Sequence, residues 1–297
     1  MKIFGAIDVG TNSTRLLIAE VQHNQLRTLG VRLHTTRIGQ GMGSSRCLCP
    51  EAIERTLQVL RDYCEELKRI GVDGFRAVAT SAVRESLNPE ELLRGAAQFG
   101  LKIDVITGEE EARLSFNGAT RGLPGLLDPT VLDIGGGSTE FIWDESGALA
   151  VYSLPVGAVR LTESPQIPPE VKQTWSEVIE RLQGRLDSSL VGVGGTITTL
   201  AAIKQGLTVY QPELVHGFVL QQEAVRKIYQ FLAGLSLEGR RQVPGLQPER
   251  ADIILAGTAL LLELMDSIGQ TKIIVSEHDL LHGLIWSQVE AADVAGR

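Results

Sequence analysis

Two short segments rich in glycine and hydroxyl side chains are the residues of this chain best suited to binding an anion. They are Asp8-Val-Gly-Thr-Asn-Ser-Thr14 and Asp133-Ile-Gly-Gly-Gly-Ser-Thr139. Glycine lets backbone N–H groups approach a phosphate without a Cβ in the way, and short hydroxyl or amide side chains add donors. The expected phosphate contacts are Gly10, Thr11, Asn12, Ser13, Gly135, Gly136, Gly137, Ser138 and Thr139.

The two segments are copies of one pattern. Residues 7–18 and 132–143 align without a gap at an offset of 125 positions (133 − 8), so that Asp, Gly, Ser and Thr coincide. Each copy follows an apolar strand-like run and leads into another, which predicts a β-hairpin instead of the strand–turn–helix of a dinucleotide site. A lone pattern of this kind would be weak evidence. Two copies in register specify a duplicated fold, although duplication alone could reflect inherited architecture.

Both halves of the chain continue alike after their hairpins. Each has a third strand-like run, an amphipathic helix (residues 51–70 and 169–186), a short buried strand and further helices. Two tandem β-β-β-α-β-α units predict an α/β fold of two similar domains with a ligand cleft between them. A cluster of glycine and proline near residue 124 favours domains 1–124 and 125–297.

Acidic side chains adjoin both hairpins. If Asp8 and Asp133 face a bound phosphate they would repel it, unless Mg²⁺ is held there by one or two carboxylates, phosphate oxygens and waters. The alternative for either aspartate alone is a cap on its own turn. Glu140 directly follows the second hairpin and is a further candidate, its alternative being a solvent-facing strand residue.

Three glutamates begin a predicted helix after the strand at residues 103–106. Acids in a first turn suit the helix dipole, so capping alone accounts for Glu109, Glu110 and Glu111. Three acids are nevertheless more than a cap requires, and they point in different directions around the helix. One of them could therefore enter the cleft and orient a water as general base.

Candidate partners for a phosphate occur in three further places. Arg84 lies at the start of a predicted helix, where a cation is unfavourable for the dipole, and this favours anion binding. Arg15 is a weaker candidate because strand arginines are commonly just solvated. Gly194, Gly195 and Thr196 follow a buried strand and open a helix, which could bind an anion or form an ordinary turn.

Composition describes an ordinary globular protein. The 297 residues are 43% hydrophobic and 22% charged, which is enough for about two domains. A net charge of −8 without a Lys/Arg-rich run argues against nonspecific nucleic-acid binding. We expect no signal peptide, no membrane span and a cytoplasmic location. Cys47, Cys49 and Cys64 are expected to be free thiols, and the pair His278 and His282 lacks an evident third metal ligand.

Taken together, these motifs closely resemble the exopolyphosphatase/guanosine pentaphosphatase family. The resemblance runs from residue 1 to about residue 285 and rests on residues 6–13, 79–84, 108–114 and 132–140, joined by 191–196 and 274–283. It implies the actin/sugar-kinase/heat-shock ATPase fold. It also implies Mg²⁺-dependent release of terminal phosphate from inorganic polyphosphate or from guanosine pentaphosphate, and it favours a homodimer.

The resemblance also implies residue roles. Glu111 corresponds to the family's catalytic glutamate and Arg84 to its phosphate-binding arginine, while Asp133 and Glu140 correspond to the acids of the second glycine motif. The last motif departs from the family, which usually has Asp-Gly before an Arg-Glu-Gly, whereas residues 277–283 here read Glu-His-Asp-Leu-Leu-His-Gly. The chain looks like the family's short form, so we expect little processivity on long polyphosphate.

Three alternatives to polyphosphate hydrolysis stay open. The same hydrolase could act mainly on guanosine pentaphosphate. The fold could instead serve an ATP-dependent sugar or acetate kinase, which would need an acceptor. A phosphate or nucleotide sensor would bind polyphosphate tightly without turnover in Mg²⁺.

Overall fold

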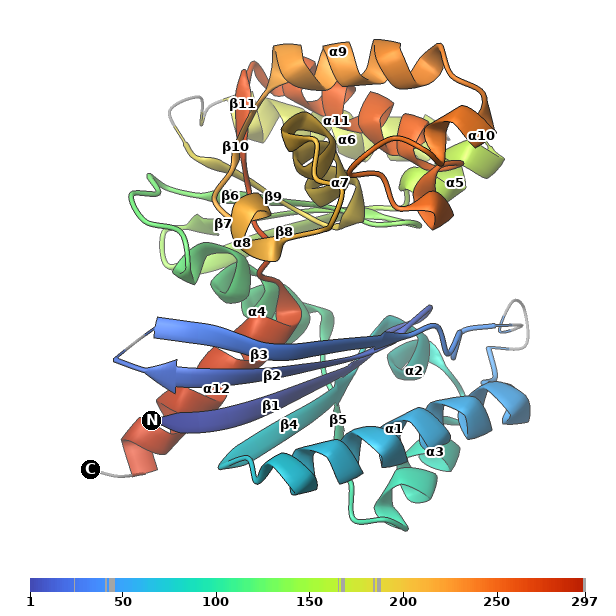
Figure 1. The fold of residues 1–297 in the computed structure, drawn as a ribbon, viewed down its shortest axis with the longest axis vertical. Coiled ribbons are helices and arrows are strands. Elements are labelled where there is room, and N and C mark those ends of the chain that lie inside the picture. Colours follow the sequence, from blue (N-terminus) through green and yellow to red (C-terminus); the bar gives the residue numbers. More distant parts are fainter. Residues whose placement is uncertain are drawn as a thin grey trace. The chain divides into compact units, whose positions relative to one another are not determined.

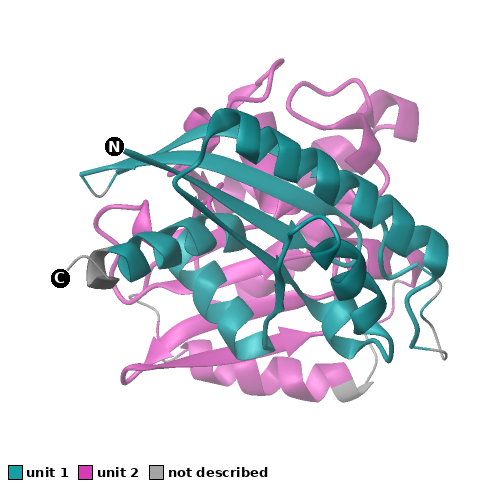
Figure 2. Ribbon diagram, turned by 90° about the horizontal axis from the view of Figure 1, so that it is seen from below, with its two compact units in different colours: residues 1–118, 279–297 teal, residues 119–278 magenta. Residues whose placement is uncertain are grey.

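The computed structural model describes residues 1–23, 25–40, 42, 46–164, 166, 169–183, 185 and 188–295. The chain forms two compact units (Figure 2). Unit 1 contains Met1–Gly118 together with Asp279–Arg297, and unit 2 contains Ala119–His278.

Unit 1 is built on a five-stranded sheet in the order β3-β2-β1-β4-β5 (Figure 1). The first three strands form an antiparallel meander, and β4 and β5 continue the sheet in parallel with β1. The strands are β1 (Lys2–Val9), β2 (Thr14–Gln22), β3 (Gln25–His34), β4 (Gly74–Ala79) and β5 (Ile103–Val105). The helices are α1 (Pro50–Ile70), α2 (Ser81–Glu85), α3 (Pro89–Ala97), α4 (Gly108–Arg121) and α12 (Leu280–Ala295).

Alternation along β1 divides the core of unit 1 between the two faces of its sheet. Ile7 and Val9 point into a cluster that includes the apolar stripe of α1, whereas Phe4 and Ala6 pack with the leucines of α12. Asp8 has the same parity as Phe4 and Ala6, so its side chain lies on the α12 face. The α1 helix begins at Pro50 and ends where Gly71 takes the left-handed conformation, as expected from proline at the first turn and glycine after the last.

Unit 2 is built on a six-stranded sheet in the order β10-β11-β9-β6-β7-β8. Its strands are β6 (Thr130–Ile134), β7 (Thr139–Glu145), β8 (Ala148–Leu154), β9 (Leu190–Val193), β10 (Val219–Gln221) and β11 (Lys272–Val275). Its helices are α5 (Ala158–Glu163), α6 (Pro169–Gln183), α7 (Gly195–Gln205), α8 (Pro212–Val215), α9 (Gln222–Ala233), α10 (Leu237–Arg240) and α11 (Ile254–Ile268), with a 3₁₀ turn at Pro248–Arg250.

The two sheets share one topology. In each, the third, second, first and fourth strands of the unit are neighbours in that order, and the next strand in the sheet is parallel to the fourth. Unit 2 adds β10 as an antiparallel edge. The predicted α/β fold of two duplicated domains is thereby confirmed, while the expectation of a ligand cleft between the domains stays a prediction.

The expected domains 1–124 and 125–297 place the C-terminal helix in the second domain, whereas in the structure it belongs to the first unit. Residues 279–297 belong to unit 1, and the chain divides after Gly118. The physical reason is that Leu284 and Ile285 of α12 are fully buried against the β1 and β2 strands of unit 1. The expected helix at residues 169–186 is observed as α6, and its residue 186 lies outside the described residues. No described helix is long and apolar enough to cross a membrane.

Candidate active site

The two glycine hairpins close in the same way. The amide of Gly10 donates to the carbonyl of Ser13 at 3.0 Å, and the amide of Gly135 donates to the carbonyl of Ser138 at 3.0 Å. A Cβ added to either glycine would lie 3.2 Å from that serine carbonyl, so both positions favour glycine. The predicted repeat is therefore a repeat of backbone geometry.

Both hairpin tips present backbone donors. The amides of Thr11 and Asn12 in unit 1, and those of Gly136 and Gly137 in unit 2, form no hydrogen bond with any described residue. These tip residues are exposed. Successive open N–H groups on a tight turn are the arrangement that binds phosphate oxygens.

An ion-pair network occupies the base of the first hairpin. Asp8 lies opposite Arg15 on the neighbouring strand, and the Arg15 guanidinium donates to Asp8 Oδ2 through Nη2 at 2.7 Å and Nε at 3.0 Å. Arg15 also pairs with Asp279, which precedes α12. The sequence made Arg15 a weaker candidate for binding phosphate, and in the structure its guanidinium pairs with two carboxylates.

Burial and charge act in opposite directions in this network. Burial raises the pKa of Asp8, and the attraction of Arg15 offsets only part of this effect. Burial also acts on Asp279, but there Arg15 and His282 outweigh it and lower the pKa. Asp8 Oδ1 is buried and makes no hydrogen bond within the described structure.

Arg84 and Glu111 meet in unit 1. Nη1 of Arg84 donates to Glu111 Oε2 at 2.8 Å and to the carbonyl of Ile106 at 3.0 Å. The two side chains are 29% and 30% exposed, so a ligand can reach both. The α2 helix, which carries Arg84, begins at Ser81, whose hydroxyl lies 2.9 Å from the hydroxyl of Thr11. The first hairpin and the Arg84–Glu111 pair are thus physically connected.

The other two glutamates of α4 have different surroundings. Glu110 pairs with Arg76 at 2.7 Å, and its amide is capped by Thr107 Oγ1 at 3.1 Å. Glu109 is exposed. Thr107 thus caps the helix, and among the three glutamates it is Glu111 that lies beside Arg84.

Two acids lie side by side at the second hairpin. Asp133 on β6 is directly opposite Glu140 on β7, which places both side chains on one face of the sheet. Ser153 donates a hydrogen bond to Glu140 at 2.8 Å. Burial raises the pKa of Glu140, and hydrogen bonds from Ser138 and Ser153 offset only part of that rise. Glu140 is thus a half-buried acid and not a solvated strand residue.

A third glycine turn adjoins Asp133. Gly194 has φ of +92°, and a Cβ on it would lie 2.7 Å from Asp133 Oδ1, so the turn requires glycine for both conformation and space. A Cβ on Gly195 would meet the guanidinium of Arg250 at 1.8 Å. Arg250 therefore lies directly against the N-terminus of α7, where a cation and helix amides could bind one anion together.

Two residues that were predicted to contact phosphate, Thr139 and Thr196, are buried in the protein interior. Thr139 is fully buried and its hydroxyl donates to the carbonyl of Val156 at 2.7 Å. Thr196 is 4% exposed and packs against Gly257 of α11. Both side chains are thus buried, and the expectation that these two residues contact phosphate stays a prediction.

A model of the Ppx/GppA phosphatase family matches residues 17–292. The chain belongs to this family. Exopolyphosphatase 2 of Mycobacterium tuberculosis is 37% identical, with 95% of this chain and 97% of that protein covered. A bifunctional 3-dehydroquinate synthase/phosphatase of Fusobacterium nucleatum is 32% identical, with 96% of this chain and 46% of that protein covered. The crystal structure of the Aquifex aeolicus Ppx/GppA family member has 32% identity, 98% coverage of both chains and a TM-score of 0.83.

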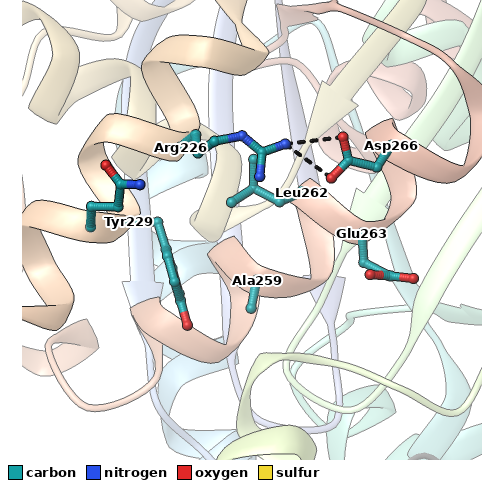
Figure 3. Close-up of a pocket in the computed structure, with 7 residues that line it drawn as sticks. Arg226, Tyr229, Ala259, Leu262, Glu263 and Asp266 are labelled. Atoms are coloured by element: carbon teal, nitrogen blue, oxygen red, sulfur yellow. Dashed lines mark hydrogen bonds and ion pairs between the residues drawn. The ribbon is translucent and has the colours of Figure 1, made fainter.

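Membership in the Ppx/GppA family identifies the chain as a hydrolase of phosphoric anhydride bonds. A pocket of unit 2 lies between α9 and α11 (Figure 3). It contains the ion pair of Arg226 with Asp266 at 3.0 Å and includes no residue of the glycine turns. This pocket is therefore separate from the glycine turns of unit 2.

The site residues are compatible with a magnesium ion. The described residues contain no group of three or more His, Cys, Asp or Glu side chains that could hold a metal by themselves. Magnesium does not need one, because it is usually bound by one or two carboxylates together with substrate phosphates and waters. The buried oxygen Asp8 Oδ1, which lacks a hydrogen bond among the described residues, and the acid pair at Asp133 are suitable donors.

The atypical last motif forms structural contacts. Glu277 accepts a hydrogen bond from the hydroxyl of Tyr210, and the ring of His278 stacks on that of His216 with centroids 4.0 Å apart. His282 lies 3.8 Å from Asp279. The i, i+4 histidine pair thus has two separate sets of partners, and α12 begins between the two histidines at Leu280.

The spacing of residues along the chain gave no indication that Arg250 lies against the third glycine turn. It lies 55 positions after Gly195 (250 − 195) within an unremarkable Pro-Glu-Arg turn. Arg15 had a detectable signal, because the offset of the repeat places it at the position of Glu140 in the other copy.

Proposed function

We propose that this chain is an exopolyphosphatase that releases terminal orthophosphate from inorganic polyphosphate by Mg²⁺-dependent hydrolysis. The observation that carries the proposal is the 2.8 Å contact of Arg84 with Glu111, on elements joined to the first glycine hairpin. A carboxylate held by an arginine next to open backbone donors combines a base with the groups that bind a phosphoryl group.

In the proposed reaction Glu111 orients a water molecule and accepts its proton. The water oxygen forms a new bond to the terminal phosphorus, while the anhydride bond breaks and its electron pair leaves with the shortened polyphosphate. The protein forms no covalent bond to the substrate in this reaction, because catalysis of phosphoryl transfer depends mainly on positioning the reactants and stabilising the charge on the phosphoryl group. Arg84 holds Glu111 in place and offers its remaining N–H groups to the phosphoryl oxygens.

The hairpin tips would bind phosphoryl oxygens through the amides of Thr11, Asn12, Gly136 and Gly137. The proposal keeps Ser13 and Ser138 as hydroxyl donors and Gly10 and Gly135 as the glycines that close each turn. Gly194 and Gly195 would add the amides of the third turn, assisted by Arg250.

We further propose Asp133 and Asp8 as the carboxylates that hold Mg²⁺. The ion would neutralise phosphoryl oxygens and so lower the repulsion between substrate and acids. Glu140 lies opposite Asp133 and would complete the acidic side of this site. Chelation should abolish phosphate release, and added Mg²⁺ should restore it.

Guanosine pentaphosphate is the second candidate substrate, because the sequence motifs resemble a family of exopolyphosphatases and guanosine pentaphosphatases. The resemblance also supports a cytoplasmic homodimer, which light scattering of the purified chain would test. Phosphate release should be measured from polyphosphate of defined length, guanosine pentaphosphate and ATP, with and without Mg²⁺. Faster turnover of pentaphosphate would make it the main substrate.

Replacement of Glu111 provides the sharpest test. Glu111→Gln should lower kcat on polyphosphate by roughly 10²–10⁴-fold, the usual contribution of a general base. Glu110→Gln on the same helix turn is the matched control, since Glu110 pairs with Arg76, and should retain activity. Wild-type rates in Glu111→Gln would refute the mechanism. Tight polyphosphate binding without turnover in the wild-type chain would indicate a sensor, and phosphate transfer only with an added sugar or acetate would indicate a kinase.

A further inference from the structure

The segment of residues 36–40, here called the strap, binds the tip of the first hairpin through its backbone. The amide of Arg37 donates to the carbonyl of Asn12 at 2.9 Å, and the amide of Gly39 donates to the carbonyl of Thr11 at 3.1 Å. The strap therefore engages the carbonyls of the tip residues and leaves their N–H groups open. Residues on the strap have a fixed position relative to the proposed phosphate site.

The strap is also anchored on its far side. Thr36 is buried, and its hydroxyl lies 2.9 Å from that of Thr14 on β2. Arg55 of α1 donates to the carbonyl of Thr36 at 3.2 and 3.1 Å and to the side chain of Gln40 at 2.9 Å. These contacts enclose Arg37 between two anchored neighbours.

Arg37 itself is held in an unfavourable backbone conformation. Its φ is +48°, in the left-handed region where a residue with a Cβ is strained and glycine or asparagine is preferred. Strained residues persist where the surrounding structure enforces them, and they cluster at ligand-binding sites. Arg46 also has positive φ, but its guanidinium donates to the carbonyl of Glu85 and so contributes to the fold.

The side chain of Arg37 makes no comparable contribution. It is exposed, and its guanidinium forms no hydrogen bond or ion pair with any residue that the structure describes. The contacts of Arg37 that hold the strap are made by backbone atoms, which any residue could supply. A long cation at a strained position beside open phosphate donors therefore has no evident purpose in the fold.

We propose that Arg37 is a substrate-binding residue that contacts a phosphoryl group of the polyphosphate held at the tip of the first hairpin. The inference rests on the proposed function. The planar guanidinium can bond two oxygens of one phosphoryl group at once, and its flexible stem extends from a backbone joined directly to Asn12. Arg37 acts on substrate binding, whereas Arg84 and Glu111 act at the reacting group.

The test is steady-state phosphate release from polyphosphate in Mg²⁺ by wild-type protein, Arg37→Gln, Arg37→Lys and Arg69→Gln. Arg69 is an exposed arginine in the last turn of α1 and controls for loss of one positive charge. Arg37→Gln should raise KM about tenfold, equal to about 1.4 kcal/mol, with kcat nearly unchanged. Arg37→Lys should recover part of this loss, and Arg69→Gln should keep the wild-type KM.

Each result has a distinct meaning. A wild-type KM in Arg37→Gln would overturn the inference while leaving the proposed function intact, and so would equal effects of Arg37→Gln and Arg69→Gln. A fall in kcat with unchanged KM would also overturn it, because Arg37 would then act in the chemical step or on the fold. Absence of polyphosphate hydrolysis by the wild-type chain would instead refute the proposed function.

Discussion

Asp133 and Glu140 lie directly opposite each other on β6 and β7, and the same two positions of the other hairpin carry Asp8 and Arg15. In unit 1 the aspartate thus faces a cation that bonds to it at 2.7 Å, whereas in unit 2 it faces a second acid. One ancestral hairpin geometry therefore supports two electrostatic environments. The acidic copy is the better place for a cation or a proton to act.

Glu140→Gln should lower kcat on polyphosphate roughly 100-fold if the acid takes part in catalysis. Burial raises the pKa of Glu140, so the ionised form is lost at a higher pH than for an exposed glutamate. Wild-type activity should therefore decline on the acid side above the usual glutamate range, and the variant should lack this contribution. Glu145→Gln at the end of the same strand is the control, and an unchanged pH–rate profile in Glu140→Gln would contradict the assignment.

Asp279→Asn should destabilise the protein by about 1–3 kcal/mol, less than for a fully buried pair because Arg15 and Asp279 remain 25% and 28% exposed. The pKa of Asp279 is lowered in the folded protein. Its ionised carboxylate therefore contributes to the free energy of unfolding above pH 3.8, and this contribution is lost progressively as the pH falls below that value. Urea unfolding should show the difference from wild type at pH 7 and a smaller difference near pH 3. In a protein that already carries Arg15→Gln, Asp279→Asn should lower the free energy of unfolding much less. An equal loss in both backgrounds would disprove the coupling between Arg15 and Asp279.

Gly283→Ala should destabilise the protein by about 1–3 kcal/mol through overpacking. A Cβ at this position in α12 would lie 1.9 Å from the carbonyl of Leu114 in α4, and backbone cannot move aside as a side chain can. The control is Gly108→Ala at the first residue of α4. The added Cβ has no heavy atom within 4 Å there, so this substitution should be tolerated. Urea midpoints of the two variants measure the difference, and similar midpoints would contradict the close helix crossing.

Gly137→Ala should leave stability unchanged and impair phosphate binding. The added Cβ meets nothing within 4 Å in the protein, so any obstruction must come from a ligand approaching the hairpin tip. We expect kcat/KM on polyphosphate to fall about tenfold, or about 1.4 kcal/mol, with an unaltered melting temperature. Gly234→Ala, which makes ordinary van der Waals contacts at the end of α9, should preserve both, and full activity in Gly137→Ala would argue against phosphate at this tip.

Local sequence patterns were sufficient to predict the two glycine hairpins. The amide of Gly10 bonds to a carbonyl only three positions away, and the same bond recurs from Gly135 to Ser138, so the turn is determined by neighbouring residues. No local pattern distinguished Glu111 as the functional acid among the three glutamates that begin α4. Its contact with Arg84 spans 27 positions, and only the resemblance to a known family singled it out before the structure was known.

The sequence by itself determined the duplicated hairpins, the succession of strands and helices that follows them and the set of chemically competent side chains, because these depend on interactions over a few residues. Tertiary structure alone decided which of those side chains meet. Arg15 bonds Asp279 across 264 positions, Arg250 lies against the turn at Gly195, and α12 packs on the first sheet. It also decided that Thr139 and Thr196 face the core. Such outcomes depend on which surfaces the packed elements bury, and no spacing along the chain encodes that directly.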